Sequence, residues 1–330
     1  MAVKKLKVGL TYDLRDDYLK EGYSTEEIAE FDFPGTIDAL EKVIQDIGYQ
    51  PDRIGNIKSL VRRLAAGDNW DLVFNIAEGL RGFGREAQIP AILDAYNIPY
   101  TFSDPLGQSL TLHKGMTKRV IRDLGIPTPD FAVVEFADDL SRVNLPYPLF
   151  AKPIAEGTGK GITSLSKITN LQELDDVCRN ILQNFKQPVL LETYLPGREF
   201  TVGILGSGSD ARALGALEII LNPTAEKNAY SYENKERCEL LVQYILVSDE
   251  EAKHAMDIAL KVWRALNLKD AGRVDLRSDA TGVPNFMEVN SLAGLNPLHS
   301  DLPILCTQLG ISYHELISSI IESALKRANN

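Results

Sequence analysis

The pattern that most constrains the fold lies near the end of the chain. There the segments 273–275 (Arg-Val-Asp) and 286–290 (Phe-Met-Glu-Val-Asn) have the composition of short strands. Residues 278–285 between them read Ser-Asp-Ala-Thr-Gly-Val-Pro-Asn, which is typical of a turn. Together the three segments predict a β-hairpin. If the turn is centred on its Thr-Gly pair, position 275 lies directly opposite position 288.

In that register four polar side chains share one face of the hairpin. Asp275 pairs with Glu288, while Arg273 and Asn290, each two positions further along a strand, point to the same side. An oxygen-rich cluster of this kind suits Mg²⁺, which commonly shares its coordination with waters and phosphates. The alternative is a solvated hairpin with scattered charges, but Val274 and its apolar neighbours favour burial of the other face.

The composition is that of a globular protein: 44% of the 330 residues are hydrophobic and 25% are charged. This length predicts two or three domains of ~150 residues. The formal net charge of -11 argues against a nucleic-acid partner. No apolar run is long enough to cross a bilayer, and the first residues lack the apolar core of a secretory signal, so we expect a cytoplasmic protein. Three scattered cysteines predict neither a disulfide framework nor a zinc site.

Strands and helices alternate in the first hundred residues, as in a small parallel α/β unit. We expect strands at 6–10 and 71–76, helices at 34–48 and 88–96, and a glycine-rich loop from Gly79 to Gly84. The segment from Asp13 to Asp32 contains eight acidic residues but only two basic ones. It is a candidate for substrate contacts, although most of it is expected to be a solvated loop.

A second α/β unit follows, and longer strands come after residue 200. The expected elements are helices at 112–124, 171–184, 249–266 and 312–328, and strands at 131–134, 149–152, 162–165, 189–192, 200–205 and 212–220. The segment 222–238 is long, polar and without periodicity, which favours a functional loop.

Gly157, Gly159 and Gly161 form a glycine-rich loop between two apolar segments. Glycines allow backbone N–H groups to approach a phosphate closely, but an ordinary hairpin turn is an equal alternative. The loop is not a Walker P-loop, because no Ser or Thr follows Lys160 and the next segment is strand-like. Lys152 ends the strand before the loop, and a buried lysine needs a partner, either a phosphate or an internal carboxylate.

Other signals are weak on their own. Lys114 begins a helix, where a surface position is the commoner outcome. Glu192 and Glu199 flank a short linker and could bind an adenine amino group and ribose hydroxyls, although on spacing alone solvent exposure explains them better. No Gly-x-Ser-x-Gly elbow and no His-Glu-x-x-His zinc helix is present in the sequence.

Together, these motifs resemble the ATP-grasp superfamily and, within it, the D-alanine–D-alanine ligase family, over nearly the whole chain. The matching segments occur in the family's order: 79–88 with 98–101, 113–114, 149–153 with the glycine loop, 191–200, and 273–275 with 287–290 and Gly294. The resemblance implies an α/β, three-lobed ATP-grasp fold. An N-terminal pre-ATP-grasp domain would occupy residues 1–103, a central subdomain 104–193, and a C-terminal subdomain with the metal site 194–330.

The resemblance also implies how ATP is held. Its phosphates would be contacted by Lys114, Lys152 and the three glycines Gly157, Gly159 and Gly161, while Thr158 in the same loop would be a catalytic residue. Adenine would be held by Glu192 and the backbone from Thr193 to Leu195, and the ribose by Glu199.

The remaining implied roles concern metal and catalysis. Asp275, Glu288 and Asn290 would bind two Mg²⁺ ions, with Mn²⁺ as a substitute. Lys235 would reach a phosphate when the 222–238 loop closes. Arg273 and the N–H of Gly294 would stabilise a tetrahedral oxyanion.

The departures from the family concentrate where the first amino acid would bind. The family's Gly-Gly-x-Ser-x-Glu segment is replaced by Gly-Leu-Thr-Tyr-Asp at 9–13, and its His-Gly…Gly-Glu-Asp-Gly loop reads Glu-Gly…Gly-Phe-Gly-Arg from Glu78 to Arg85. The glycine-loop Ser is Thr158, the Tyr after the closing-loop Lys is Glu236, and the Ser expected to hold the acceptor carboxylate falls at His299, beside Ser300. Glu78, Arg85, His299 and Ser300 are therefore candidate substrate contacts.

The sequence thus predicts an ATP-dependent carboxylate–amine ligase that acts through an acyl phosphate on small, amino-acid-like substrates, with a homodimer as one assembly that the resemblance allows. Two alternatives stay open: a true D-alanine–D-alanine ligase of peptidoglycan synthesis, and a non-catalytic ATP-binding regulatory module. The intact Arg273, Asp275, Glu288 and Asn290 argue against the second.

Overall fold

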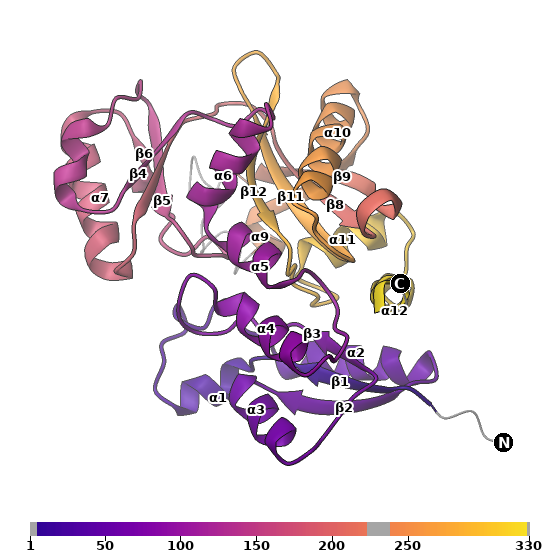
Figure 1. Cartoon of the computed structure of the whole chain (residues 1–330). Helices are drawn as coiled ribbons and strands as arrows, with labels where there is room; N and C mark the ends of the chain where they lie inside the picture. Colours follow the sequence, from indigo (N-terminus) through magenta and orange to yellow (C-terminus); the bar gives the residue numbers. More distant parts are fainter. Residues whose placement is uncertain (1–4, 223–237, 329–330) are drawn as a thin grey trace.

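The computed structural model describes residues 5–222 and 238–328 of the chain. They form three lobes, each built on its own sheet. In Figure 1 the N-terminal lobe lies below, and the central and C-terminal lobes lie above it on the left and right. Among the described residues, no helix is long and apolar enough to cross a membrane.

The N-terminal lobe is a three-stranded parallel sheet in the order β2-β1-β3. Helices cover both faces: in β3, Phe74 joins a buried cluster with α2 and the C-terminal helix α12, while Val73 joins one with α3 and α4. Strands covered on both faces are expected to read as continuous apolar runs, as β1 and β3 do. The elements of this lobe are β1 (Lys7–Thr11), α1 (Arg15–Lys20), α2 (Pro34–Asp46), β2 (Gln50–Gly55), α3 (Ile57–Ala65), β3 (Leu72–Asn75) and α4 (Gln88–Ala95).

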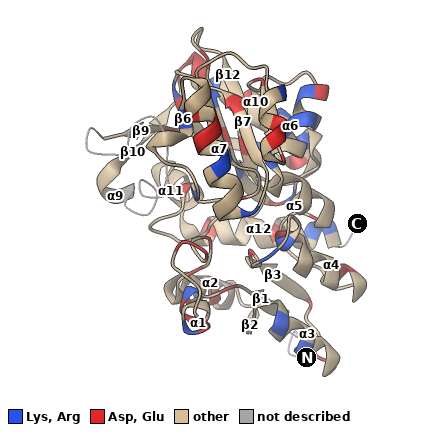
Figure 2. Cartoon of the chain, turned by 90° about the vertical axis from the view of Figure 1, so that its left-hand side faces the viewer, with Lys and Arg blue, Asp and Glu red and all other residues tan. Residues whose placement is uncertain are grey.

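The central lobe is a four-stranded antiparallel sheet in the order β4-β7-β5-β6. Helix α7 packs on it through Leu174, Cys178 and Ile181, whose spacing places them on one helical face. The rest of helix α7 carries acidic residues beside basic ones (Figure 2). The elements are α5 (Pro105–Leu112), α6 (Lys114–Asp123), β4 (Phe131–Val134), β5 (Leu149–Pro153), β6 (Lys167–Ile168), α7 (Leu171–Phe185) and β7 (Val189–Thr193).

The C-terminal lobe is a five-stranded antiparallel sheet in the order β10-β9-β8-β11-β12. Helix α10 packs on one face, with Trp263 in the same cluster as Phe200 of β8. On the other face α11 lies so close to β8 that a Cβ at Gly203 would come within 2.5 Å of Leu305. The elements are β8 (Glu199–Leu205), β9 (Arg212–Leu221), α9 (Cys238–Leu241), β10 (Val242–Val247), α10 (Glu250–Ala265), β11 (Ala271–Ser278), β12 (Pro284–Asn290), α11 (Asp301–Gln308) and α12 (Tyr313–Ala328).

A buried carboxylate fixes the N-terminal lobe against the C-terminal one. Asp270, which is fully buried, accepts hydrogen bonds of 2.7 Å from the backbone N–H of Phe102 and from Arg327 of α12. Arg327 also donates to the carbonyl of Tyr100 at 3.1 Å. Hydrogen bonds to a buried charge are among the stronger ones, so this cluster holds two lobes in a defined relation.

The predicted helix 112–124 is confirmed as α6. It begins at Lys114, because His113 leaves helical geometry and its Nδ1 accepts the N–H of Met116 at 3.2 Å. The predicted strand 162–165 is wrong. Thr163 instead caps a short 3-10 turn at Ser164–Ser166, and β6 begins only at Lys167.

The sequence analysis also missed β2, β10, α1, α3, α5, α9 and α11. β2 is an edge strand that begins Gln-Pro-Asp-Arg, so it lacks an apolar pattern. Each predicted domain range contains one of the three sheets, while the boundaries at 103/104 and 193/194 remain a prediction.

Candidate active site

The β11–β12 hairpin has the predicted register at the polar residues 273–275 and 288–290. Asp275 of β11 pairs with Glu288 of β12, and Arg273 pairs with Asn290. A bulge follows between Asp275 and Leu276, so that the pairing beyond it is shifted by one residue. Bulges of this kind re-aim side chains and are frequent beside active sites.

Asp275 lies at the centre of a network of donors. Thr201 donates to its Oδ1 at 2.5 Å, Asn290 Nδ2 lies 3.3 Å from its Oδ2, and Arg273 donates to the same oxygen. Arg273 also lies 3.4 Å from Asp301, the first residue of α11. Burial would lower the pKa of Arg273, but the surrounding carboxylates raise it instead, so the guanidinium stays charged.

Two lysines converge on Glu288 from the central lobe. The Nζ atoms of Lys114 and Lys152 each lie 3.6 Å from its Oε2. Lys114 also donates to the carbonyl of Glu156 at 2.6 Å, and burial lowers its pKa. Both lysines are buried, which excludes the surface alternative for Lys114.

The predicted side-chain contact of Glu192 with adenine is not supported by its position. Glu192 is fully buried between Lys118 at 2.5 Å and Lys152 at 3.0 Å, and it lines neither of the cavities described below. The solvent-exposed alternative is wrong, because Glu192 is fully buried. Burial lowers the pKa of Lys118 to about 8, while the two lysines outweigh burial and lower the pKa of Glu192. The sequence analysis missed Lys118, whose spacing of four from Lys114 on α6 was the available signal.

Lys152 therefore has an internal carboxylate partner, as one of the two alternatives proposed. Its second partner, Glu288, lies at the cavity, so the lysine connects a buried ion pair to the site. Burial would lower the pKa of Lys152, but Glu192 and Glu288 raise it.

Two cavities meet at this cluster. The smaller, of about 90 Å³, is lined on the central-lobe side by Thr193, Leu195, Gly159 and Lys152, and on the other side by Glu199 and Asp275. The larger, of about 290 Å³, lies between the N-terminal and C-terminal lobes. Four residues line both cavities: Lys114, Arg273, Glu288 and Asp301.

The glycine-rich loop lies between the two cavities. Gly157 and Thr158 line the larger cavity and Gly159 the smaller one. Thr158 has a φ of +53°, a strained conformation for a β-branched residue and one that is concentrated at functional sites. Gly161 lines neither cavity; a Cβ there would lie 2.5 Å from Pro153, so this glycine serves packing.

Glu30, from the acidic segment, holds this loop. Its Oε1 accepts the N–H of Gly157 at 2.8 Å, and Arg85 donates to both of its oxygens at 3.0 and 2.9 Å. Arg85 also donates to the carbonyl of Ala155 at 2.8 Å and lines neither cavity. The structure thus gives Arg85 a different place from the predicted substrate contact: it joins the N-terminal lobe to the glycine loop.

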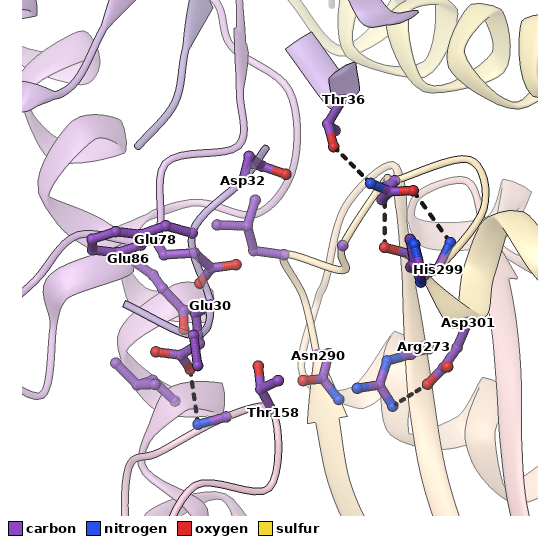
Figure 3. A pocket seen from close by; sticks show the side chains of 18 of the residues that line it. Glu30, Asp32, Thr36, Glu78, Glu86, Thr158, Arg273, Asn290, His299 and Asp301 are labelled. Carbon is purple, nitrogen blue, oxygen red and sulfur yellow. Dashed lines mark hydrogen bonds and ion pairs between the residues drawn. The ribbon is translucent and has the colours of Figure 1, made fainter. Parts of the chain in front are cut away.

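The other predicted substrate contacts line the larger cavity, as does Gly294. Figure 3 shows Glu78 on its N-terminal wall and His299 on the opposite side. Ser300 Oγ accepts the N–H of Asn296 at 3.0 Å, and a Cβ at Gly294 would lie 2.8 Å from that Oγ. Only glycine therefore leaves this segment undisturbed.

Sequence reasoning missed four acidic residues of this cavity as individuals: Glu30, Asp32, Glu86 and Asp301. The acidic segment as a whole is a candidate for substrate contacts, but no local pattern indicates which of its carboxylates face inward. Lys235 lies outside the described residues, as does most of the predicted closing loop. Among residues 5–222 and 238–328, no group of three or more His, Cys, Asp or Glu side chains could hold a metal ion by itself.

Comparisons with known proteins agree with this arrangement. Residues 120–322 match the family described as "D-ala D-ala ligase C-terminus". The chain is 33% identical to an uncharacterised protein of Sinorhizobium fredii, covering 78% of this chain and 75% of that protein. It is 31% identical to the D-alanine–D-alanine ligase of Aquifex aeolicus, covering 86% of this chain and 92% of the relative.

A solved structure shares the fold. The crystal structure of the D-alanine–D-alanine ligase of Bacillus anthracis, complexed with ATP, superposes with a TM-score of 0.73 over 98% of this chain and 99% of that one, at 21% identity. The three-lobed α/β prediction is therefore confirmed. The chain belongs to the D-alanine–D-alanine ligase family, a family of ATP-grasp carbon–nitrogen ligases.

Proposed function

We propose that this enzyme uses ATP to activate the carboxylate of an amino-acid-like substrate as an acyl phosphate and then joins it to an amine. The observation that carries the proposal is the meeting of two cavities at Lys114, Arg273, Glu288 and Asp301. A γ-phosphate at this junction would have cations on both sides, and the carboxylate of the donor substrate would reach it from the larger cavity. Such positioning supplies much of the rate in phosphoryl transfer.

The smaller cavity is the proposed nucleotide site. The backbone from Thr193 to Leu195 would hold adenine, Glu199 the ribose, and Lys114 and Lys152 the phosphates, together with the loop from Gly157 to Gly159. At about 90 Å³ the cavity must widen to admit a nucleotide, since ligand pockets commonly reach ~300 Å³ or more. Glu192 would act indirectly, by fixing Lys152.

The residues of the hairpin fit a magnesium site. Asp275, Glu288 and Asn290 provide two carboxylates and an amide oxygen, all of them oxygen donors, and too few to enclose an ion without further ligands. Mg²⁺ is characteristically held by one or two carboxylates plus substrate phosphates. When bound there, one or two Mg²⁺ ions, or Mn²⁺ in their place, would neutralise charge on the transferring phosphoryl group.

The chemistry requires two balanced steps. A carboxylate oxygen attacks the γ-phosphorus, and the bond to the β–γ bridging oxygen breaks to release ADP. The amine then attacks the acyl carbon, and phosphate leaves while the amine gives up a proton. Arg273 and the N–H of Gly294 line the cavity where the oxyanion of the second step forms, and preorganised donors of this kind stabilise such charge. Lys235 would complete the phosphate contacts.

The amino-acid side of the site differs from that of a D-alanine–D-alanine ligase. Four carboxylates line the wall of the larger cavity where the donor would lie: Glu30, Asp32, Glu78 and Glu86. His299 and Ser300 on the opposite side are the proposed contacts of an acceptor carboxylate. We therefore propose amino-acid-like substrates other than two D-alanines.

The test is release of ADP and phosphate from ATP and Mg²⁺ across a panel of donor and acceptor amino acids, with products identified by mass spectrometry. We expect ATP turnover that depends on an amino acid and a new amide product. ATP binding without turnover on any pair would favour the non-catalytic module. Glu322→Gln, an exposed change on α12, is the matched control for acidic substitutions.

A further inference from the structure

One wall of the larger cavity carries carboxylates that have no counter-charge in contact among the described residues. Asp32, Glu78 and Glu86 line it from the N-terminal lobe, and Figure 3 shows them on the side facing Arg273 and Asn290. None of the three side chains makes an ion pair or hydrogen bond with any other described residue. The side chain of Glu86 belongs to a residue that is only 9% exposed, and it lines the cavity without a partner among the described residues. A charge in that position is costly unless a ligand neutralises it.

The neighbouring cations are committed elsewhere. Arg85 binds Glu30 through two contacts, and Lys160 lies 3.3 Å from the same carboxylate. Lys114 points to Glu288 and the carbonyl of Glu156. Among residues 5–222 and 238–328, Arg15 is the further cation that lines this wall, and it also donates to the carbonyls of Phe31 and Ala29. With all groups ionised, the three carboxylates outnumber this guanidinium by two among the described residues.

The pKa values of the three carboxyl groups reflect the same excess of negative charge, because burial and mutual repulsion raise them. Burial, followed by the charge of Asp13, raises the pKa of Asp32 to about 8, with Arg15 opposing. Burial and the charge of Glu30 raise the pKa of Glu86 to about 7, with Arg85 and Lys114 opposing. The pKa of Glu78 is raised by burial and by Glu86, Glu30 and Asp32. A cation between these groups would restore their charged forms.

The spacing of the carboxylates favours an organic cation over a metal ion. No three His, Cys, Asp or Glu side chains among the described residues converge closely enough to chelate a metal. An α-ammonium group supplies one positive charge, whereas the wall presents an excess of two. An elongated substrate with two separated cationic groups would reach carboxylates that lie apart and would neutralise both excess negative charges.

We propose that the donor substrate is a basic amino acid, whose α-ammonium and side-chain amine or guanidine are both held by Asp32, Glu78 and Glu86. This deepens the proposed function and rests on it for the position of the donor carboxylate, which lies at the junction near Arg273 and Lys114. From there the substrate extends across the cavity to the acidic wall. The volume of about 290 Å³ leaves room for a side chain longer than a methyl group.

The experiment compares matched donors in ATP turnover. Lysine, ornithine and arginine, as both enantiomers, are set against the uncharged norleucine and citrulline and against D-alanine. We expect kcat/KM for a basic donor to exceed that of its uncharged match at least tenfold, since a hydrogen bond to a charged group commonly has that effect. In Glu86→Gln this preference should fall at least tenfold, with the loss in KM, and Glu322→Gln should retain it.

A binding measurement separates this inference from the proposed function. Thermal unfolding with and without lysine or arginine, in wild type and Glu86→Gln, needs no turnover. A shift in the wild type that Glu86→Gln loses supports the cationic subsite even if no ligase activity is found. Turnover with uncharged donors and none with basic ones would overturn the subsite while leaving the ligase function standing. The absence of both the shift and the basic-donor preference would likewise overturn it.

Discussion

The carboxylate of Glu30 accepts a hydrogen bond of 2.8 Å from the backbone N–H of Gly157, across 127 positions of sequence. A Cβ at Gly157 would lie 2.3 Å from that oxygen, so only glycine permits the approach. The acidic segment of the N-terminal lobe thereby contacts the loop proposed to bind phosphate. The carboxylate of Glu30 accepts a backbone N–H of a kind that commonly binds anions. The position of the N-terminal lobe is therefore coupled to the conformation of the glycine-rich loop.

This contact predicts a pH-dependent contribution to stability. Burial alone would raise the pKa of Glu30, but Arg85 and Lys160 hold it down to about 2. A lowered pKa means that the contribution is complete above the unfolded value of about 4.5 and is lost as pH falls towards 2. Wild type should exceed Glu30→Gln in free energy of unfolding by about 3 kcal/mol near pH 6, with the gap narrowing below pH 4.5. Denaturant titrations at several pH values test this; a gap that is constant from pH 6 to pH 3 would contradict it.

The ionisation of Glu86 should affect stability with the opposite pH dependence. Its pKa is raised to about 7 by burial, so ionisation destabilises the free protein as pH rises from about 4.5 to about 7, and the cost persists above that. Glu86→Gln should therefore stabilise the free protein by up to about 3 kcal/mol at pH 8 and have little effect near pH 4. Thermal unfolding across this pH range measures it, with Glu322→Gln as control. Destabilisation at pH 8 would show that Glu86 has a partner in the folded protein.

A substitution in the hairpin site should reduce activity without a comparable loss of stability. Glu288→Gln retains shape but removes the charge that the metal and both lysines face. We expect ATP turnover to fall at least a hundredfold, while the unfolding temperature changes little. Wild-type turnover in this variant would rule out the metal assignment, and loss of the folded state would show a structural role instead.

Replacement of Lys152 by alanine should weaken the binding of nucleotide. Replacement by alanine removes one cation from the smaller cavity and leaves Glu192 with Lys118 alone. Loss of a charged contact of ~1.5–3 kcal/mol corresponds to roughly tenfold to over a hundredfold weaker ATP binding. Calorimetric titration with ATP and Mg²⁺ provides the measurement, and the exposed Lys253→Ala should bind like wild type. Equal affinities for the two variants would remove Lys152 from the phosphate site.

The parts of the site that the sequence predicted are those set by local pattern. The pairing of Asp275 with Glu288 follows from a turn and two flanking strands, and the place of Lys152 at a strand end indicates a buried lysine with a partner. Lys114 is different: its local pattern favours a surface position, and only the family resemblance places it at the site. The acidic wall could not be predicted in the same way. Glu30 and Asp32 lie far from Glu86 in the sequence and come together only in the folded N-terminal lobe, and no periodicity within a segment encodes that contact. Similarly, the burial of Glu192 depends on Lys118 from a separate helix.

We expect the D-alanine dipeptide to be at most a minor product of this enzyme. The positions that would contact a donor amino acid differ from the family pattern together, and Asp32, Glu78 and Glu86 line the cavity of about 290 Å³ in which we propose that the donor binds. The small apolar side chain of D-alanine would leave at least one of these carboxylates without a partner, and an unmade charged hydrogen bond costs ~1.5–3 kcal/mol. Incubation with ATP, Mg²⁺ and D-alanine should therefore give little or no dipeptide, at least tenfold less than the best donor of the panel. His299 and Ser300 lie on the opposite side and are unaffected by this argument, so D-alanine is a better candidate as acceptor than as donor. Efficient dipeptide formation, with saturation at modest D-alanine concentration, would refute the altered specificity and support the peptidoglycan role.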